Sequence, residues 1–288
     1  MDAKKAARLS LFLFVILFTV ATIGFSSSNG SGGKSNTLGM KFFYIEPGAF
    51  MMGSPQDEPG RDSNETQHKV TLTQGYYMQT TPVTQGQWEA VMEDNPSFFD
   101  ECGDDCPVEM VSWNDAQDFI AKLNDLEDTN RYALPTEAQW EYAARAGSTT
   151  AFANGEIAET RCGYEPNLNV MGWYCGNSSV SYIGCLDISM YGGPKCAGTQ
   201  PVAKKQPNDW GLYDMHGNVW EWMSDFYGNY PSSAVVDPTG PVLGTERVIR
   251  GGSWSGVAMS SRSACRYGFG PAYRYETFGF RLILLPEL

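Results

Sequence analysis

Three stretches of the chain place apolar residues at helical spacing behind a capping residue. In the clearest one, Ser112 and Asp115 can form a capping box, and the apolar residues that follow recur at the i, i+3, i+4, i+7 spacing of one buried face. These residues are Ala116, Phe119, Ile120, Leu123 and Leu126. Thr84 to Gln87 and Thr136 to Gln139 repeat the capping pattern, each shortly after a proline. The pattern predicts three short helices, the third ending at Gly147, a typical left-handed cap residue.

Short apolar runs between turn residues predict strands elsewhere. Met40 to Met52 contains two such runs around the turn pair Pro47-Gly48, which is typical of a hairpin. Val70 to Met78 predicts another strand. Val248 to Trp254 and Phe278 to Leu285 predict two closing strands, and the last is apolar enough to lie centrally in a small sheet. The chain therefore mixes short helices with short strands, and it shows no internal repeat.

The stretch from Thr149 to Gln206 lacks both periodicities and is rich in Gly, Asn, Ser, Cys and Tyr. This composition predicts ordered loops held by something other than hydrogen-bond ladders, and disulfides are the obvious means. The chain has 7 cysteines, and a zinc site is the alternative, but their spacing lacks the paired short intervals of structural zinc. Neighbours in sequence suggest the pairs Cys102 with Cys106, Cys162 with Cys175, and Cys185 with Cys196, although the connectivity stays open.

The first 25 residues have the pattern of an export signal. Basic residues precede an apolar run from Leu9 to Phe25, which matches the two regions of a signal peptide. The run is slightly short for a membrane span of about 20 residues, and an uncleaved N-terminal anchor is the alternative. Residues 26–37 start with a Gly/Ser-rich stretch too poor in apolar residues to fold, which predicts a flexible linker. We expect an exported protein, whether periplasmic, secreted or tethered to the surface, with its folded domain in residues 38–288.

Composition and charge narrow the possible partners. Hydrophobic residues make up 42% of the 288 residues, enough for a large core, while 31 glycines and 16 prolines indicate a loop-rich globular fold. The formal net charge is −13, and no cluster of Lys or Arg follows the first eight residues. Such a surface repels a phosphate backbone. Nucleic acid is therefore not expected as a partner, and a membrane contact is expected only through the N-terminal segment.

One stretch, Asn208 to Trp222, concentrates aromatic residues, two glycines and the carboxylates of Asp214 and Glu221 in a way that neither periodicity explains. Carboxylate and main-chain carbonyl oxygens around a tight turn are the ligands that calcium prefers. The candidate ligands are the side chains of Asp214 and Glu221 and the carbonyls of Gly217 and Val219. The alternative is that the aromatic residues belong to the core and the two carboxylates pair with arginines.

Several blocks of the sequence together carry a resemblance to a known family. In chain order they are Pro82-Val-Thr84, Pro107-Val-Glu-Met-Val-Ser-Trp113, Leu134-Pro-Thr-Glu-Ala-Gln-Trp-Glu-Tyr-Ala-Ala-Arg145, Gly211-Leu-Tyr-Asp-Met-His-Gly-Asn-Val-Trp-Glu-Trp222, Arg250-Gly-Gly-Ser-Trp254, Arg262-Ser-Ala264 and Gly279-Phe-Arg281. The chain resembles the formylglycine-generating enzymes, also called sulfatase-modifying factors, over about residues 40–285. The resemblance implies an α+β domain of C-type-lectin-like fold with little regular secondary structure, short helices and small antiparallel sheets. It also implies a calcium loop, here on Asp214, Gly217, Val219 and Glu221.

The resemblance breaks down where the family's chemistry is carried. Members that oxidise a substrate cysteine to formylglycine use two cysteines shortly after the Gly-Gly-Ser-aromatic motif, and these thiolates bind copper. Here the two positions fall on Gly256 and Ser261. The nearby thiol of Cys265 is either buried and inert or made more acidic by its cationic neighbour Arg266. Copper is therefore not expected, and Cys265 is only a weak candidate for a catalytic group.

The two histidines suggest no metal site. His216 lies within the calcium-type loop, where hydrogen bonding to the backbone explains it, and His68 lies in a polar segment where we expect it to be solvated. Relatives that use iron need a cluster of histidines, so this chemistry is not expected either.

These observations favour a binding or accessory protein that keeps the fold and its groove without the oxidase chemistry. The groove is expected beside Trp220, Ser253 and Trp254, and its ligand is a peptide, another protein or a glycan. The alternatives are an oxidase that acts on a cysteine of an exported sulfatase or peptide, and a structural surface protein.

Overall fold

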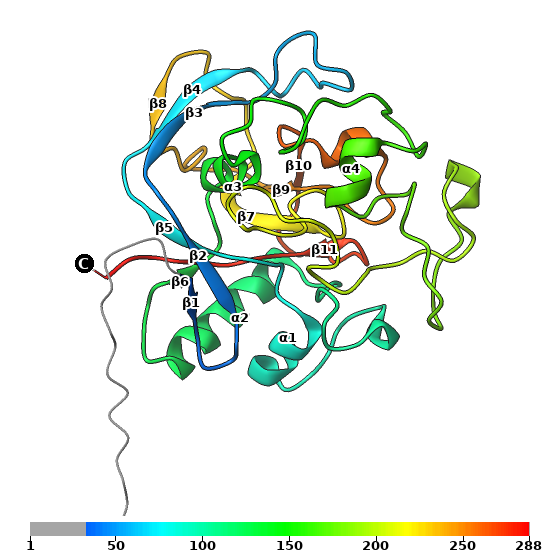
Figure 1. The fold of residues 1–288 in the computed structure, drawn as a ribbon. Coiled ribbons are helices and arrows are strands. Elements are labelled where there is room, and N and C mark those ends of the chain that lie inside the picture. The colour runs from blue at the N-terminus through cyan, green and yellow to red at the C-terminus, as the bar shows by residue number, and fades with distance from the viewer. Residues whose placement is uncertain (1–32, 288) are drawn as a thin grey trace, which may run out of the picture. The chain divides into compact units, whose positions relative to one another are not determined.

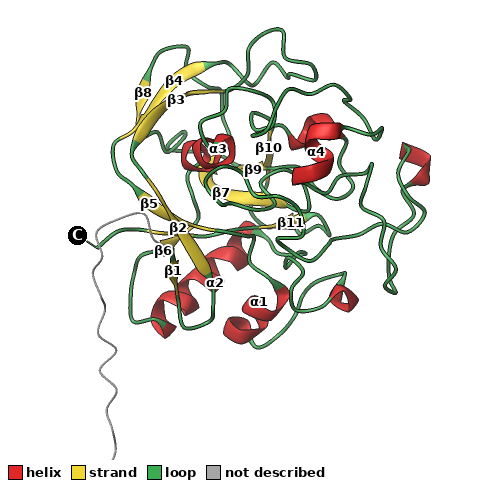
Figure 2. Ribbon diagram, viewed as in Figure 1, coloured by secondary structure: helices red, strands yellow, loops and turns green. Residues whose placement is uncertain are grey.

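The computed structural model describes residues 33–287, and the predicted export signal and most of the predicted linker lie outside this range. Short helices and strands are joined by long loops (Figures 1 and 2). The helices are α1 (Gln85–Met92), η1 (Asp100–Cys102), α2 (Trp113–Leu126), α3 (Glu137–Arg145), α4 (Pro166–Met171), η2 (Ser189–Tyr191) and η3 (Ala258–Ser261). The strands are β1 (Lys34–Ser35), β2 (Lys41–Ile45), β3 (Gly48–Met52), β4 (His68–Leu72), β5 (Tyr76–Gln79), β6 (Tyr132–Ala133), β7 (Trp220–Phe226), β8 (Val235–Val236), β9 (Arg247–Arg250), β10 (Arg266–Phe269), β11 (Phe278–Gly279) and β12 (Ile283–Leu284). Within residues 33–287, none of the helices has the length and apolarity needed to cross a bilayer.

The three predicted helices form, and each begins at the predicted capping residue. The side chains of Thr84, Ser112 and Thr136 accept a hydrogen bond from the amide three residues later, and the side chain at that position bonds back to the cap amide. Helix α3 ends at Arg145, because Ala146 already takes the left-handed conformation with φ 46°.

The apolar face of α2 is buried as predicted, except at its last residue. Helix α2 lies beside α1 (Figure 1), and their rings stack where Trp88 meets Phe119 at 5.3 Å. Leu126 is instead 56% exposed. The two helices therefore cover the core, but the C-terminal turn of α2 is not buried against it.

The first sheet has the order β1-β2-β5-β12-β6, and all of its pairs are antiparallel. Strand β12 lies inside it, as predicted for the end of the chain, but the single strand predicted from Phe278 to Leu285 is wrong, because β11 pairs with β7 in another sheet. The predicted hairpin at Pro47-Gly48 is wrong, because β2 pairs with β5 while β3 pairs with β4 in another sheet. The predicted strand from Val70 to Met78 is likewise two strands of different sheets. Gly75 breaks it, since a Cβ there would lie 2.2 Å from the hydroxyl of Tyr44.

Ordered structure begins earlier than the predicted linker end at residue 37. Lys34 and Ser35 form β1 and pair with Phe42 and Lys41 of β2. Thr37 is also held, since its amide donates to a carboxylate oxygen of Glu127 at 3.0 Å.

Two smaller sheets have the orders β10-β9-β7-β11 and β3-β4-β8. They are small, as the resemblance implies, but β11 pairs parallel to β7 and β8 parallel to β4, so they are not purely antiparallel. Strand β7 begins at Trp220 inside the stretch Asn208–Trp222 and carries it into the centre of the domain, where Trp222 is fully buried.

Candidate functional site

The loop before β7 is tied to two distant segments by its backbone. Gly217 has φ 104°, and a Cβ there would lie 2.1 Å from the carbonyl oxygen of Trp173, so only glycine fits. The Gly217 amide donates to the Gly251 carbonyl at 2.6 Å, and the Asn218 amide donates to Trp173 at 2.8 Å. Asp214 and Asn218 also have positive φ values of 54° and 66°. These positive φ values and hydrogen bonds hold the loop in one sharply turned conformation.

Asp214 has a carboxylate oxygen that suits a cation. The side chain is 2% exposed, and its Oδ2 accepts the Ala203 amide at 2.8 Å. Its Oδ1 is buried and has no partner among the described residues. Burial raises the pKa of Asp214 to about 6, against the opposing effects of the Ala203 amide and Arg281. A bound cation would supply the missing partner and favour the charged form.

Most of the hydrogen-bond acceptor positions of Glu221 are already used, which limits what it can offer a cation. Its Oε2 accepts Arg281 Nε at 2.7 Å and the Trp140 indole at 2.8 Å, while its Oε1 accepts Arg281 Nη2 at 2.8 Å. One lone pair of Oε1 therefore remains. The alternative expectation for this carboxylate is confirmed, since Glu221 pairs with Arg281, while its role as a calcium ligand stays a prediction. Within residues 33–287, no three His, Cys, Asp or Glu side chains converge on a metal-binding point, so a cation here would need main-chain carbonyls.

The residues expected to line a groove are buried. Ser253 and Trp254 are each 1% exposed and Trp220 is 8% exposed. The Trp254 ring packs edge-on against Phe99 at 5.1 Å, and its indole donates to the Glu276 carbonyl at 3.0 Å. Sequence pattern does not separate an aromatic residue of a groove from one of the core. These three side chains present almost no surface to a ligand.

The segment where the family places its copper-binding cysteines is covered by another loop. Gly60 lies so close to η3 that a Cβ would meet the Met259 side chain at 2.6 Å. Ser261 is fully buried. Arg262, directly after it, pairs with Glu58 at 2.5 Å and Glu65 at 2.7 Å. The loop that contains these two glutamates is therefore fastened over η3.

Cys265 is the only free cysteine among the described residues, and it is buried. Burial raises the pKa of its thiol to about 12, although Arg262 and Arg250 act in the opposite direction. The cationic neighbours considered from the sequence therefore do not make the thiol acidic. A neutral thiol is neither a good metal ligand nor a good nucleophile.

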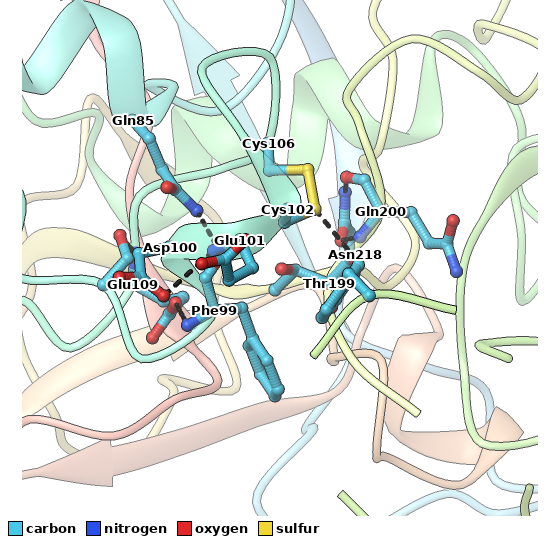
Figure 3. Close-up of a disulfide and its surroundings, with 12 residues drawn as sticks. Gln85, Phe99, Asp100, Glu101, Cys102, Cys106, Glu109, Thr199, Gln200 and Asn218 are labelled. Atoms are coloured by element: carbon cyan, nitrogen blue, oxygen red, sulfur yellow. Dashed lines mark hydrogen bonds between the residues drawn. A yellow bond between two sulfur atoms is a disulfide. The ribbon is translucent and has the colours of Figure 1, made fainter. Parts of the chain in front are cut away.

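The three disulfides join the pairs suggested by sequence proximity, which are Cys102–Cys106, Cys162–Cys175 and Cys185–Cys196. Figure 3 shows Cys102–Cys106 beside Thr199 and Gln200. The Asn218 side chain binds both main-chain groups of Gln200, at 3.1 and 3.0 Å. The loop before β7 is thereby joined to the irregular region from Thr149 to Gln206.

Glu109, in the same close-up, is a buried carboxylate held by backbone amides. Its oxygens accept the amides of Phe98 at 3.1 Å and Phe99 at 2.8 Å (Figure 3). Burial nevertheless raises its pKa to about 8.

Replacing Glu109 with glutamine should make the protein less sensitive to alkaline pH. Because the folded pKa lies above the ordinary value, the folded state binds a proton that the unfolded state has lost, and stability falls as pH rises from about 4.5 to about 8. Glutamine is uncharged like the protonated acid, but its NH2 group cannot accept one of the two amides, so the expected result is a smaller loss of stability between pH 5 and pH 8 than in the wild type. Urea unfolding at pH 5 and pH 8 measures this, with exposed Glu101→Gln as control. Parallel losses in all three proteins would contradict it.

The structure places the two histidines differently from each other. His216 is buried and bonded to the backbone as expected, to the Ser261 carbonyl at 2.8 Å and the Ala153 amide at 3.1 Å. His68 is not solvated, contrary to expectation. It is 4% exposed and packs against the Tyr230 ring at 4.9 Å.

A network of buried charges around α3 was not predicted from sequence. Glu141 binds Arg145 and Arg250, while Glu137 binds Arg266 at 2.6 Å. All five residues are at least 95% buried. Each of these residues lies in or directly beside one of the motif blocks, but a motif block does not show which acidic residue pairs with which arginine.

Comparison with known proteins agrees with this structure. The model of the sulfatase-modifying factor enzyme 1-like domain matches residues 32–285. A formylglycine-generating enzyme of Streptomyces coelicolor is 36% identical over 186 residues, which is 61% of this chain but only 51% of the enzyme, so the match spans about half the length of that relative.

Two other similar proteins match nearly over their whole length. The chaperone protein LppX of Paenibacillus barcinonensis is 29% identical over 276 residues, which is 83% of this chain and 87% of LppX. The solved structure of Treponema denticola variable protein 1 is 29% identical, with a TM-score of 0.74 over 88% of this chain and 99% of that one. Because the domain model matches nearly the whole described range, the chain belongs to the sulfatase-modifying factor enzyme 1-like family and has its α+β fold.

Proposed function

We propose that this chain is an exported, calcium-stabilised binding or accessory protein without formylglycine-generating oxidase activity. The observation that carries the proposal is the state of the sulfur atoms. Six cysteines lie in disulfides, and the remaining Cys265 is buried with a raised pKa. Copper held by two thiolates needs a second free sulfur, so the residues present do not fit that group.

The ion pairs at η3 support the same proposal. In place of a thiol pair, this segment presents Arg262 clamped by Glu58 and Glu65 under a covering loop. Such a buried cluster fills the position with charges that already satisfy one another. The segment then stabilises the domain instead of binding oxygen or a substrate cysteine.

The partner we propose is another protein or peptide, in preference to a glycan. The relative LppX, which matches over most of both chains, carries the name of a chaperone. Large hydrophobic side chains of the disulfide-rich segment are also exposed, as is typical of surfaces that contact other proteins. They are Tyr164, Ile183, Met190 and Tyr191. The disulfides suit an oxidising compartment, which agrees with the export signal predicted from the sequence.

The oxidase alternative rests on the similarity to formylglycine-generating enzyme, and a direct assay separates the two. Purified protein is incubated with copper, oxygen and a peptide that carries the sulfatase-type Cys-x-Pro-x-Arg motif, and the aldehyde is sought by mass spectrometry. We expect no aldehyde. Turnover that disappears in Cys265→Ala would overturn the proposal and make Cys265 catalytic.

Calcium should stabilise the protein through the loop before β7, with Asp214 and Glu221 giving side-chain oxygens and Gly217 and Val219 giving carbonyls. We expect calcium to raise the melting temperature, and at 100 times the Kd the gain in unfolding free energy is about 2.7 kcal/mol. Asp214→Asn should abolish the gain, since it neutralises the orphaned oxygen without touching the Arg281 pair. Scanning calorimetry with calcium or a chelator measures this.

The control is Asp57→Asn, which removes the same charge from an exposed position. It should keep the full response to calcium. A wild-type melting temperature that chelation leaves unchanged would remove calcium from the proposal. Glu221→Ala is less informative, because it also leaves Arg281 buried without its partner.

A further inference from the structure

A second site is a cavity of about 330 Å³ beside the first turn of α3. The end of β7 and the segments that follow it, 225–231 and 235–241, form most of the wall, and β3, β4, β10 and the first turn of α3 complete it. Its apolar surface comes mainly from Pro231, Pro238, Pro241 and Val235. The volume is in the range of small-ligand sites.

Two buried acceptors line this cavity with a free atom each. Asp225 is 4% exposed, and its Oδ2 accepts the Glu137 amide at 2.9 Å and the Ser224 hydroxyl at 3.1 Å. Its Oδ1 accepts no hydrogen bond from any described residue. Gly240 allows close approach to this oxygen, since its φ is 72° and a Cβ would lie 3.1 Å from Oδ1.

His68 supplies the second acceptor. Its Nδ1 lies 2.9 Å from the Thr66 carbonyl, and because a carbonyl can only accept, Nδ1 carries the proton. With Nδ1 as the donor, Nε2 is the acceptor nitrogen of the uncharged ring, and within residues 33–287 only Nδ1 of this ring forms a hydrogen bond. A ligand that donates hydrogen bonds would therefore suit this cavity.

The charges that line the cavity favour a cationic ligand. Two carboxylates, Glu137 and Asp225, face one guanidinium, Arg266. Arg266 is occupied by Glu137, at 2.6 Å from Nε and 2.8 Å from Nη2. Among the described residues Asp225 forms no ion pair, although Arg247 and Arg266 lie near enough to act on it, and an anion in the cavity would be repelled by this unpaired carboxylate. The net charge of −13 also attracts cations to the surface as a whole.

We propose that this cavity binds a primary ammonium group on an aliphatic stem, with the ammonium donating to Asp225 Oδ1 and His68 Nε2 and the stem lying against the prolines. Three donors on one small cation suit two fixed acceptors and leave one hydrogen for water. The ammonium belongs either to a lysine side chain of a partner protein or to a free small amine. This site goes beyond the proposed function and involves neither Cys265 nor η3.

Binding should depend on pH through Asp225. Burial and then Glu137 of α3 raise the pKa of Asp225 to about 7, against the opposing charge of Arg266 of β10. Arg247 of β9 also lies close enough to feel this carboxylate. Because the cation needs the ionised form, the affinity should rise as pH increases through about 7.

The test titrates the full chain with n-butylammonium chloride, with acetyl-lysine amide and with neutral n-pentanol, and follows heat of binding by calorimetry. We expect both amines to bind and pentanol not to bind, and Asp225→Asn to weaken the amines at least tenfold and remove the pH dependence. Asparagine keeps an acceptor for the Glu137 amide, so this hydrogen bond at the start of α3 survives. Asp57→Asn should bind as the wild type does.

A second variant keeps the test decisive if Asp225→Asn fails to fold. Thr239→Arg changes an exposed residue of the rim and supplies a cation of its own, so it should also abolish binding. If only n-butylammonium binds, the natural ligand is a free amine; if acetyl-lysine amide binds as well, a lysine side chain is also accepted. No amine binding, equal binding of pentanol, or amine binding unchanged by both variants would overturn the proposal.

Discussion

Replacing Glu141 with alanine is expected to lower the free energy of unfolding by about 4 kcal/mol. Glu141 is fully buried and holds Arg145 and Arg250 at once. Its Oε1 also accepts the Gly53 amide at 2.9 Å. The substitution leaves two buried guanidinium groups and one amide without this acceptor, and removing one partner of a buried pair costs far more than the pair contributes. Chemical denaturation at pH 7 measures the loss.

The matched control for this experiment is Glu89→Ala, on the exposed face of α1. Its effect should stay within about 0.5 kcal/mol. A loss below about 1 kcal/mol for Glu141→Ala would mean that water reaches the two arginines and that the network is not closed.

Replacing Trp254 with alanine should cost about 3–5 kcal/mol, the range for removing a large aromatic from a core. The ring is 1% exposed, packs edge-on against Phe99 and donates to the Glu276 carbonyl. A groove residue, as the sequence suggested, would instead lose ligand affinity with little loss of stability. Thermal and urea unfolding of the variant therefore decide between the two roles.

Tyr191→Ala is the companion variant, since it also truncates an aromatic ring but from a 68% exposed position. We expect a change within about 0.5 kcal/mol. A stable Trp254→Ala protein, with a melting temperature like that of Tyr191→Ala, would restore the groove beside Ser253.

The parts of the fold that the sequence predicted well are governed by local interactions. The three capping boxes lie within four consecutive residues each, so Thr84, Ser112 and Thr136 mark the helix starts before any tertiary contact is known. The disulfides likewise join close neighbours in sequence, at most 13 residues apart. The calcium site in the loop before β7 stays a prediction, and Glu221 pairs there with Arg281 from the end of the chain.

The predictions that failed depend on partners far away in the chain. An extended segment near Pro47 pairs wherever a complementary edge lies, and β2 and β3 found different sheets. His68 looked solvated because its neighbours are polar, yet Tyr230 covers it from 162 positions further along the chain. Neither contact leaves a trace in the local pattern.

The order of residues along the chain was sufficient for the helix starts, the family and the missing thiol pair, because each follows from residue identity or from neighbours within a short distance. It suggested the cysteine pairs, and the structure decided them. The strand partners, the burial of Trp254, the charge network at Glu141 and the cavity at Asp225 were settled only when distant segments packed together. Burial and charge compensation are properties of a packed environment, and a sequence lists the groups without stating which of them share it.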